Sequence, residues 1–182
     1  ADLSTSLSGM MAVINAWGPD VTDATTVANA FFTAQKNGVT TVQELAESIG
    51  SVAPIAKSMG LSVEETMASV AALTKGGMST DMATTGLRAT LTALAKPSKE
   101  AEETLRKFGV PVGIAEVRAK GLTFTLQKLI ELQKKSPNAI SKAIPNVKAL
   151  TGVLAMDETK MKEVHKTLGM IQSDIKNGTG LN

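Results

Sequence analysis

The chain has 182 residues, a formal net charge of +2 and no cysteine. This length suffices for one compact domain that buries roughly 70% of its unfolded surface, and the lack of cysteine excludes disulfides and a thiolate metal site. His165 is the one histidine, and Phe and Trp are the aromatic residue types present, so the composition argues against a zinc site and favours an aliphatic, helical core.

A short phrase that begins with glycine recurs through the first half of the sequence and predicts where helices meet. Its four copies lie at residues 18–23, 38–43, 60–65 and 77–81. Glycine is predicted to take the left-handed backbone that ends one helix, and a Ser, Thr or Asp two residues later is predicted to cap the next. The predicted caps are Asp20, Thr40, Ser62 and Ser79. In the first three copies, the residues predicted to complete a capping box are Asp23, Gln43 and Glu65.

Apolar periodicity between these junctions predicts the helices of the first half. They span residues 3–17, 21–36, 42–59, 63–74 and 80–95. Pro54 lies inside the third segment, which is therefore predicted to be two short helices with a break near Gly50. Ser98 is predicted to cap a sixth helix, whose first turn is rich in glutamate, as the helix dipole favours.

The second half of the chain begins with a change of pattern. Residues 108–122 lose the helical periodicity and gain Gly and Pro, so we expect a connecting loop there. Helices are predicted to resume at residues 123–135, 138–144, 146–155 and 158–175, with a stop or kink at Pro145.

The expected fold class is all-α: a multi-helix array of short helices and helical hairpins joined by Gly-apolar-Ser/Thr/Asp junctions. The predicted organisation has three parts. Residues 1–108 form a helical core module, residues 109–122 form a connecting loop, and residues 123–182 form a C-terminal helical segment that packs on the core.

Charge is unevenly distributed along the chain. Residues 1–95 carry four basic and eight acidic side chains and residues 96–182 carry fifteen and nine, so the two halves have net charges of −4 and +6. A solvated helical surface explains this asymmetry, and head-to-tail contacts or an acidic partner are the alternatives. We predict no nucleic-acid specificity, because no dense basic stripe with stacking aromatic residues is present. No apolar stretch reaches the roughly 18–20 residues of a membrane span.

Some side chains are of types that act in catalysis and are therefore candidates. Two glutamate pairs offer the carboxylates of a glycosidase: Glu64 with Glu65, and Glu102 with Glu103. Both pairs lie in predicted first helical turns, where acids are favoured electrostatically. His165 lies in a charged helical segment, which favours a solvent-facing position. The glycines at residues 76–77 and 109–113 lack the Lys and Ser/Thr of a phosphate loop, and most of the nine methionines fall at core spacing. We therefore predict no enzyme activity and no catalytic, cofactor-binding or metal-binding residues.

Eight phrases of the chain carry a family resemblance through their order and spacing. They lie at residues 28–34, 41–45, 52–61, 72–77, 84–91, 96–99, 108–110 and 145–156. Together they resemble the core of phage tail tape measure proteins, of the family named after the lactococcal phage TP901. The resemblance implies a structural virion protein that sets tail length during assembly, occupies the tail tube and leaves it when DNA is ejected.

The same resemblance implies partners and a location. The implied partners are the tail tube protein, tail assembly chaperones, tail tip proteins and further tape measure chains. The implied location is the lumen of the tail tube in the virion, and the host bacterial cytoplasm during assembly. The family has no shared catalytic residues. Because Ala1 opens the chain where a helix is already predicted, we expect it to be a fragment of a longer protein.

The glycine junctions qualify the idea of a ruler. As one continuous helix, a chain of 182 residues would span about 270 Å, whereas a compact fold would have a radius of gyration of about 16 Å. The junctions argue against the rod, so we expect a globular or rearranging helical module, with the measuring shaft elsewhere in the parent chain. The alternatives are a helical interaction module whose methionine-bearing grooves bind partner helices, and a murein hydrolase fragment.

Overall fold

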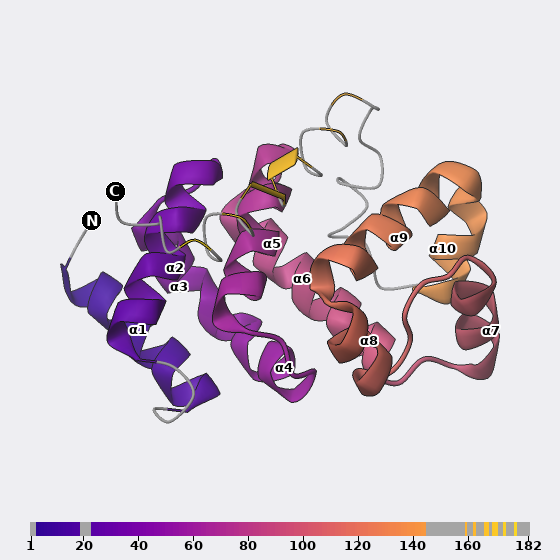
Figure 1. Ribbon diagram of the computed structural model, residues 1–182, viewed down its shortest axis with the longest axis horizontal. Coiled ribbons are helices and arrows are strands. Elements are labelled where there is room, and N and C mark those ends of the chain that lie inside the picture. Colours follow the sequence, from indigo (N-terminus) through magenta and orange to yellow (C-terminus); the bar gives the residue numbers. More distant parts are fainter. Residues whose placement is uncertain are drawn as a thin grey trace.

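The structure of the protein is a computed structural model, and it describes residues 3–18 and 23–144 together with a few single positions between 159 and 177. Within these residues the regular elements are helices, which confirms the all-α fold class (Figure 1). The α-helices described are α1 (Leu3–Trp17), α2 (Ala24–Asn37), α3 (Val42–Ser48), α4 (Ala53–Ser58), α5 (Val63–Lys75), α6 (Thr80–Ala95), α7 (Lys99–Lys107), α8 (Ile114–Lys120), α9 (Leu122–Lys135) and α10 (Pro137–Ala143). A 3₁₀-helix, η1 (Ile49–Ser51), lies between α3 and α4.

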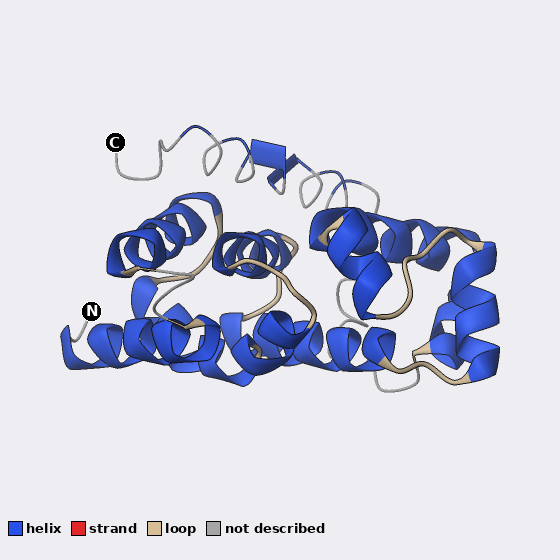
Figure 2. Cartoon of the chain, turned by 60° about the horizontal axis from the view of Figure 1, so that its bottom comes forward, coloured by secondary structure: helices blue, strands red, loops and turns tan. Residues whose placement is uncertain are grey.

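The helices form an elongated array around one apolar core. Figure 1 shows α1, α2 and α3 at one end of the long axis and α7 and α10 at the other, and Figure 2 shows helices stacked in two layers along this axis. The largest fully buried side chains are Phe31, Leu45, Ile49, Met59, Met67, Leu73, Leu87, Leu91, Leu94, Leu105, Leu122 and Leu129. Since these residues span the chain from α2 to α9 and belong to one cluster, a single core supports the whole array.

The helices predicted in the first half agree closely with those observed. Helix α1 has the predicted bounds, and α5 and α6 match their predictions to within one residue. The segment at residues 42–59 is divided as predicted: α3 ends at Ser48, and α4 begins at Ala53 with Pro54 in its first turn. The helices predicted at residues 146–155 and 158–175 lie outside the described residues, and the three-part domain division stays a prediction.

Three predicted helix caps are confirmed. The hydroxyls of Ser62, Ser79 and Ser98 accept the backbone N–H three residues later, at N···O distances of 3.0, 3.3 and 3.2 Å. The predicted cap Asp20 lies outside the described residues, and α2 begins at Ala24 with Asp23 as its N-cap. The side chain of the N-cap residue therefore caps α2, α3, α5, α6 and α7, whereas the N-cap residues of α4, α8, α9 and α10 provide no side-chain cap.

The cap predicted at Thr40 is wrong by one residue. Thr41 caps α3, and Glu44 rather than Gln43 completes the capping box: the Glu44 N–H donates to Thr41 Oγ1 at 3.1 Å, and the Thr41 N–H donates to the Glu44 carboxylate at 2.8 Å. Thr40 is buried instead, with its Oγ1 hydrogen-bonded to Thr80 Oγ1 at 2.7 Å. This hydroxyl pair joins the α2–α3 turn to the first turn of α6, a long-range contact that local sequence rules do not contain.

Three of the four junction glycines take the predicted left-handed backbone: Gly18 (φ 95°), Gly60 (φ 72°) and Gly77 (φ 101°). Gly38 does not, since its φ of −100° is accessible to any residue. A Cβ at Gly38 would lie 2.9 Å from Thr74 Oγ1 and 3.0 Å from Ala71 Cα. Glycine is needed there because the α2–α3 turn approaches α5 closely.

The loop predicted at residues 108–122 is wrong in its central part, where α8 forms. Gly113 (φ 82°) and Gly121 (φ 86°) bracket this helix. Val117 is the one buried residue of its seven, so the segment shows no apolar periodicity that could reveal a helix. The surrounding structure, more than the local sequence, stabilises so short a helix.

The third junction, at residues 60–65, contacts helices that are distant in sequence. The Trp17 indole N–H, at the end of α1, donates to the carbonyl oxygen of Leu61 at 2.7 Å in a buried setting. The guanidinium of Arg118, in α8, lies directly over Gly60, where an added Cβ would overlap it. The turn between α4 and α5 is therefore in contact with both α1 and α8.

The same junction also caps α9. Glu65, in the first turn of α5, was predicted to form a capping box with Ser62, but its carboxylate accepts the N–H of Leu122. Leu122 is the first residue of α9, and Gly121, the N-cap of that helix, has no side chain with which to bind its amides. Glu65 therefore supplies from α5 the acceptor that the sequence next to α9 lacks.

Two glycines with nearly equal φ angles test the contact with Arg118. A Cβ at Gly109 (φ 70°) would have nothing within 4 Å, whereas Gly60 (φ 72°) is covered by the Arg118 guanidinium. Gly109→Ala is expected to cost about 1–2 kcal/mol, the penalty for a left-handed alanine. Gly60→Ala should cost more, because Arg118 must also move. Chemical denaturation measures both, and an Arg118→Ala background should remove the difference. Equal effects in the wild-type background would contradict the contact.

Candidate functional site

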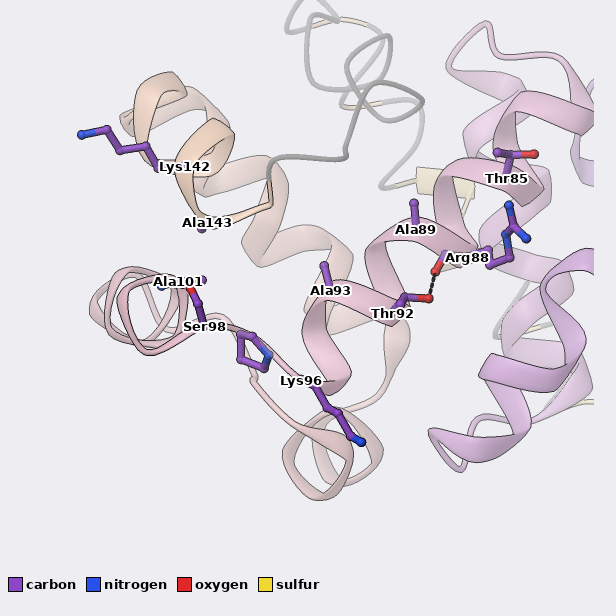
Figure 3. Close-up of a pocket in the computed structure, with 11 residues that line it drawn as sticks. Thr85, Arg88, Ala89, Thr92, Ala93, Lys96, Ser98, Ala101, Lys142 and Ala143 are labelled. Atoms are coloured by element: carbon purple, nitrogen blue, oxygen red, sulfur yellow. Dashed lines mark hydrogen bonds between the residues drawn. The ribbon is translucent and has the colours of Figure 1, made fainter.

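A pocket of about 630 Å³ opens along one face of α6, where this helix approaches α7 and α10 (Figure 3). Six lining residues share that face of α6 at helical spacing: Thr85, Arg88, Ala89, Thr92, Ala93 and Lys96. The other lining residues are Pro97, Ser98, Ala101, Lys142 and Ala143. The volume falls within the ~300–1,000 Å³ typical of binding pockets.

The two faces of helix α6 have different surroundings: one packs in the core and the other lines the pocket. Leu87, Leu91 and Leu94 fill the core from one side of the helix. On the pocket side, Ala89 and Ala93 are half-buried, and the small size of these side chains leaves the space open. The pocket is thus a part of the α6 surface that no neighbouring helix of the described chain fills.

The edge of the pocket is cationic. Arg88, Lys96 and Lys142 line it together with no Asp or Glu, and Figure 3 shows these side chains extending away from the alanines between them. The ion pairs found within the described ranges involve Arg106 and Lys128. Among the described residues, no carboxylate therefore neutralises the pocket cations.

Helix α1 presents a second exposed surface. Leu3, Leu7 and Met11 are 72%, 51% and 54% exposed, respectively. All fifteen residues of α1 are uncharged. Helices that face solvent normally carry charged residues on the outer side, so this uncharged apolar stripe is typical of a surface that another helix covers.

The first glutamate pair considered for catalysis, Glu64 and Glu65, lies in the first turn of α5, as predicted. Glu65 is hydrogen-bonded to the N–H of Leu122. The position of this carboxylate is therefore explained by helix capping, and no catalytic role is needed to account for it.

One acid of the second pair, Glu102, belongs to an exposed charge network. The guanidinium of Arg106 contacts Glu102 at 2.9 Å and Glu116 at 2.6 Å, and Glu116 also accepts the N–H of Val112 at 3.2 Å. The hydrogen bond from Arg106, followed by that from Val112, lowers the pKa of Glu116. The hydrogen bond to Glu116, followed by that to Glu102, raises the pKa of Arg106. The network joins α7 to α8 and gives Glu102 a structural role. Glu103 is exposed on the same helix and lies outside the network.

The remaining candidate groups show no reactive arrangement. His165 lies outside the described residues. Within those that are described, no three His, Asp or Glu side chains are grouped to hold a metal ion. None of the helices in the same ranges combines the length and the apolar character needed to cross a membrane. Met59 and Met67 are buried, as their core spacing predicted, and Met78 of the fourth junction is buried too, whereas Met11 and Met82 are exposed.

The pocket was not anticipated from the sequence, although a signal for it exists. Ala89 and Ala93, with Arg88 and Lys96 beside them, recur at steps of three and four along α6. That pattern describes a face with an apolar centre and cationic edges. The contributions of α7 and α10 depend on tertiary packing, so the sequence alone does not define the enclosed space.

The fold is an elongated helical array in which two of the four candidate acids, Glu65 and Glu102, make structural contacts. The family model of phage-related minor tail proteins matches residues 1–180, and the chain belongs to this family. The resemblance to tape measure proteins is confirmed by relatives that carry that name, whereas the assignment to the TP901 group stays a prediction.

Three curated relatives cover parts of the chain. The tape measure protein of Pneumococcus phage Dp-1 is 35% identical over 60% of this chain and 10% of its own length. The probable tape measure protein of Escherichia phage P2 is 34% identical over 46% of this chain and 10% of its own. That of Clostridium phage phiCD119 is 36% identical over 57% of this chain and 11% of its own. The chain thus matches about one tenth of each relative. No solved structure matches it.

The long-range cap of α9 makes a stability prediction. Glu65→Ala removes the acceptor of the Leu122 N–H and is expected to cost about 1.5 kcal/mol, as for other hydrogen bonds to charged groups. Glu65→Gln retains an acceptor oxygen and should cost less. The matched control is Glu64→Ala in the same turn of α5. Urea denaturation of the three variants measures these differences, and equal losses for Glu64→Ala and Glu65→Ala would contradict the role of the cap.

The lowered pKa of Glu116 predicts a pH dependence of stability. The ordinary carboxyl pKa is 4.5, and the folded value lies below it. A carboxyl whose pKa is depressed on folding stabilises the folded state above the unfolded pKa, and this contribution is lost as the pH falls through the folded pKa. The free energy of unfolding should therefore differ most between wild type and Glu116→Gln at neutral pH, and the difference should shrink below pH 4.5.

Denaturation at a series of pH values measures this difference. The effect should be modest and weakened by salt, because the network is exposed. In an Arg106→Gln background, most of the pH dependence of the difference should disappear. A difference between wild type and Glu116→Gln that stays constant from acid to neutral pH would contradict the assignment.

Proposed function

We propose that the chain is a helical module of a phage tail tape measure protein, a structural protein whose whole length determines the length of the tail. The observation that carries this proposal is the family match over residues 1–180, together with the three relatives named tape measure proteins. Because the chain spans about a tenth of those relatives, the measuring role belongs to the parent protein.

The helix lengths suggest how this module contributes. The longest described helix, α6, has 16 residues, which corresponds to roughly 24 Å at 1.5 Å per residue. Successive helices fold back on one another around a common core. A folded module of this kind adds little length to a ruler, so the measuring shaft lies elsewhere in the parent chain or requires this module to rearrange.

The proposed role includes partners and a location. The parent protein occupies the lumen of the tail tube, leaves it when DNA is ejected, and is present in the host bacterial cytoplasm during assembly. Its partners are the tail tube protein, tail assembly chaperones, tail tip proteins and further tape measure chains. The uncovered apolar stripe of Leu3, Leu7 and Met11 supports a contact between α1 and another helix. We assign no catalytic step to the module.

Tail length in a phage that encodes this chain tests the proposal. The same number of residues is inserted at two places in the parent gene: at Gly77, which is exposed with no atom within 4 Å of an added Cβ, and within a long helix outside the matched family region. The helical insertion should lengthen the tail by about 1.5 Å per residue, because it extends the shaft. The insertion at Gly77 should leave tail length unchanged.

Electron microscopy of purified tails gives the lengths, and a normal yield of infectious particles is the control for assembly. Lengthening at the Gly77 insertion by the same ~1.5 Å per residue would contradict a folded module. Unchanged length after the helical insertion would contradict the tape measure role itself.

A further inference from the structure

We propose that the pocket between α6, α7 and α10 binds a helix of another polypeptide, one that carries bulky apolar side chains along one face and Asp or Glu at its edges. The inference goes beyond the tail-length role, because it assigns a docking site to particular residues of this module. Three features support it: the shape of the pocket, its small apolar floor and its uncompensated charge.

The shape suits a helix. The pocket residues of α6 run from Thr85 to Lys96 along one face, a length of about 16 Å or three helical turns. Helices α7 and α10 bound the space from the other side through Ala101 and Ala143, both of which are almost fully buried. An elongated groove of this length accommodates a helix of three turns.

The floor selects bulky apolar side chains. It consists of Ala89 and Ala93 of α6, with Pro97 at one end and Ala101 of α7 on the opposite side. Small side chains leave room above them, and the apolar surface they expose is covered favourably by larger aliphatic or aromatic groups. A partner helix that places such groups at steps of three and four would insert them between α6 and α7.

The positive charge of the pocket margin favours a partner helix with acidic groups along its edges. Arg88, Lys96 and Lys142 lie at the margin of the floor with their charged ends directed away from it (Figure 3), and no carboxylate lines the pocket or is paired with them among the described residues. Complementary carboxylates would strengthen and orient the association, whereas a basic partner would be repelled. The pocket lies in the half of the chain that carries a net charge of +6.

The lining favours a peptide over a nucleic acid. No aromatic residue lines the pocket, so it has no platform on which bases could stack. The alanine floor would also give a phosphate backbone no favourable contact. An amphipathic acidic helix uses both the floor and the cations.

A selection experiment tests the preference without assuming a sequence. A displayed library of randomised helical peptides of about 15 residues, long enough to span the groove, is selected against the full chain. The enriched peptides should combine apolar residues at steps of three and four with an excess of Asp and Glu. Enrichment of basic or uncharged peptides, or no enrichment, would overturn the proposal.

Variants then locate the binding site of one enriched peptide, which is synthesised with a fluorescent label. Lys96→Glu with Lys142→Glu reverses the edge charge, and Ala93→Phe fills the floor. Each should weaken binding by about tenfold or more in fluorescence anisotropy. The matched control is Lys135→Glu, an exposed lysine of α9 outside the pocket, which should leave the affinity unchanged. Circular dichroism melts confirm that each variant folds.

Specific results would overturn the assignment. If Lys135→Glu weakened peptide binding as much as the pocket substitutions do, the binding would be a general charge attraction. If the peptide bound Ala93→Phe as tightly as the wild-type chain, the pocket would not be its binding site. Displacement of the peptide by a DNA duplex would favour a nucleic-acid ligand. If the chain self-associates and the pocket substitutions abolish this association, the occupant is a second copy of the chain, and a separate partner helix is excluded.

Discussion

The hydrogen bond from the Leu122 N–H to the carboxylate of Glu65 holds together two parts of the array that are far apart in sequence. The N-cap of α9 is Gly121, which has no side chain to accept an amide N–H, so a side-chain acceptor must come from elsewhere. The junction that supplies it also accepts the Trp17 indole N–H at Leu61 and lies beneath Arg118. Contacts with α1, α8 and α9 thus converge on one turn before α5. The placement of α9, and through it of α10 and the pocket, depends on this turn.

Local chemistry made much of the fold predictable. Serine caps, glycine turns and apolar spacing each depend on a few neighbouring residues. Ser62, Ser79 and Ser98 accordingly cap helices at the predicted positions. The errors come from tertiary contacts that local rules do not contain. Thr40 bonds to Thr80 of α6 rather than capping α3, and α8 exists although Val117 alone of its residues is buried.

The candidate site was less predictable than the fold. The family that the chain resembles has no shared catalytic residues. Of the four glutamates considered for catalysis, two have structural partners: Glu65 binds the Leu122 amide, and Glu102 binds Arg106. The surfaces left uncovered are the apolar stripe of α1 and the alanine floor beside α6. Both were present in the sequence as helical spacing, but only packing separates an uncovered face from a core face. A module built this way suits a protein that functions by contact with other chains.

Native-state hydrogen exchange at the Leu122 amide probes the Glu65 cap, because that proton lies in the bond on which the arrangement of the helices depends. We predict that in the wild-type chain this amide is protected nearly as well as the core amides of α5. In Glu65→Ala, it should lose its protection while the core amides of α5 keep most of theirs. Rapid exchange at Leu122 in the wild-type chain, or protection unchanged by Glu65→Ala, would contradict this role of the Glu65 cap.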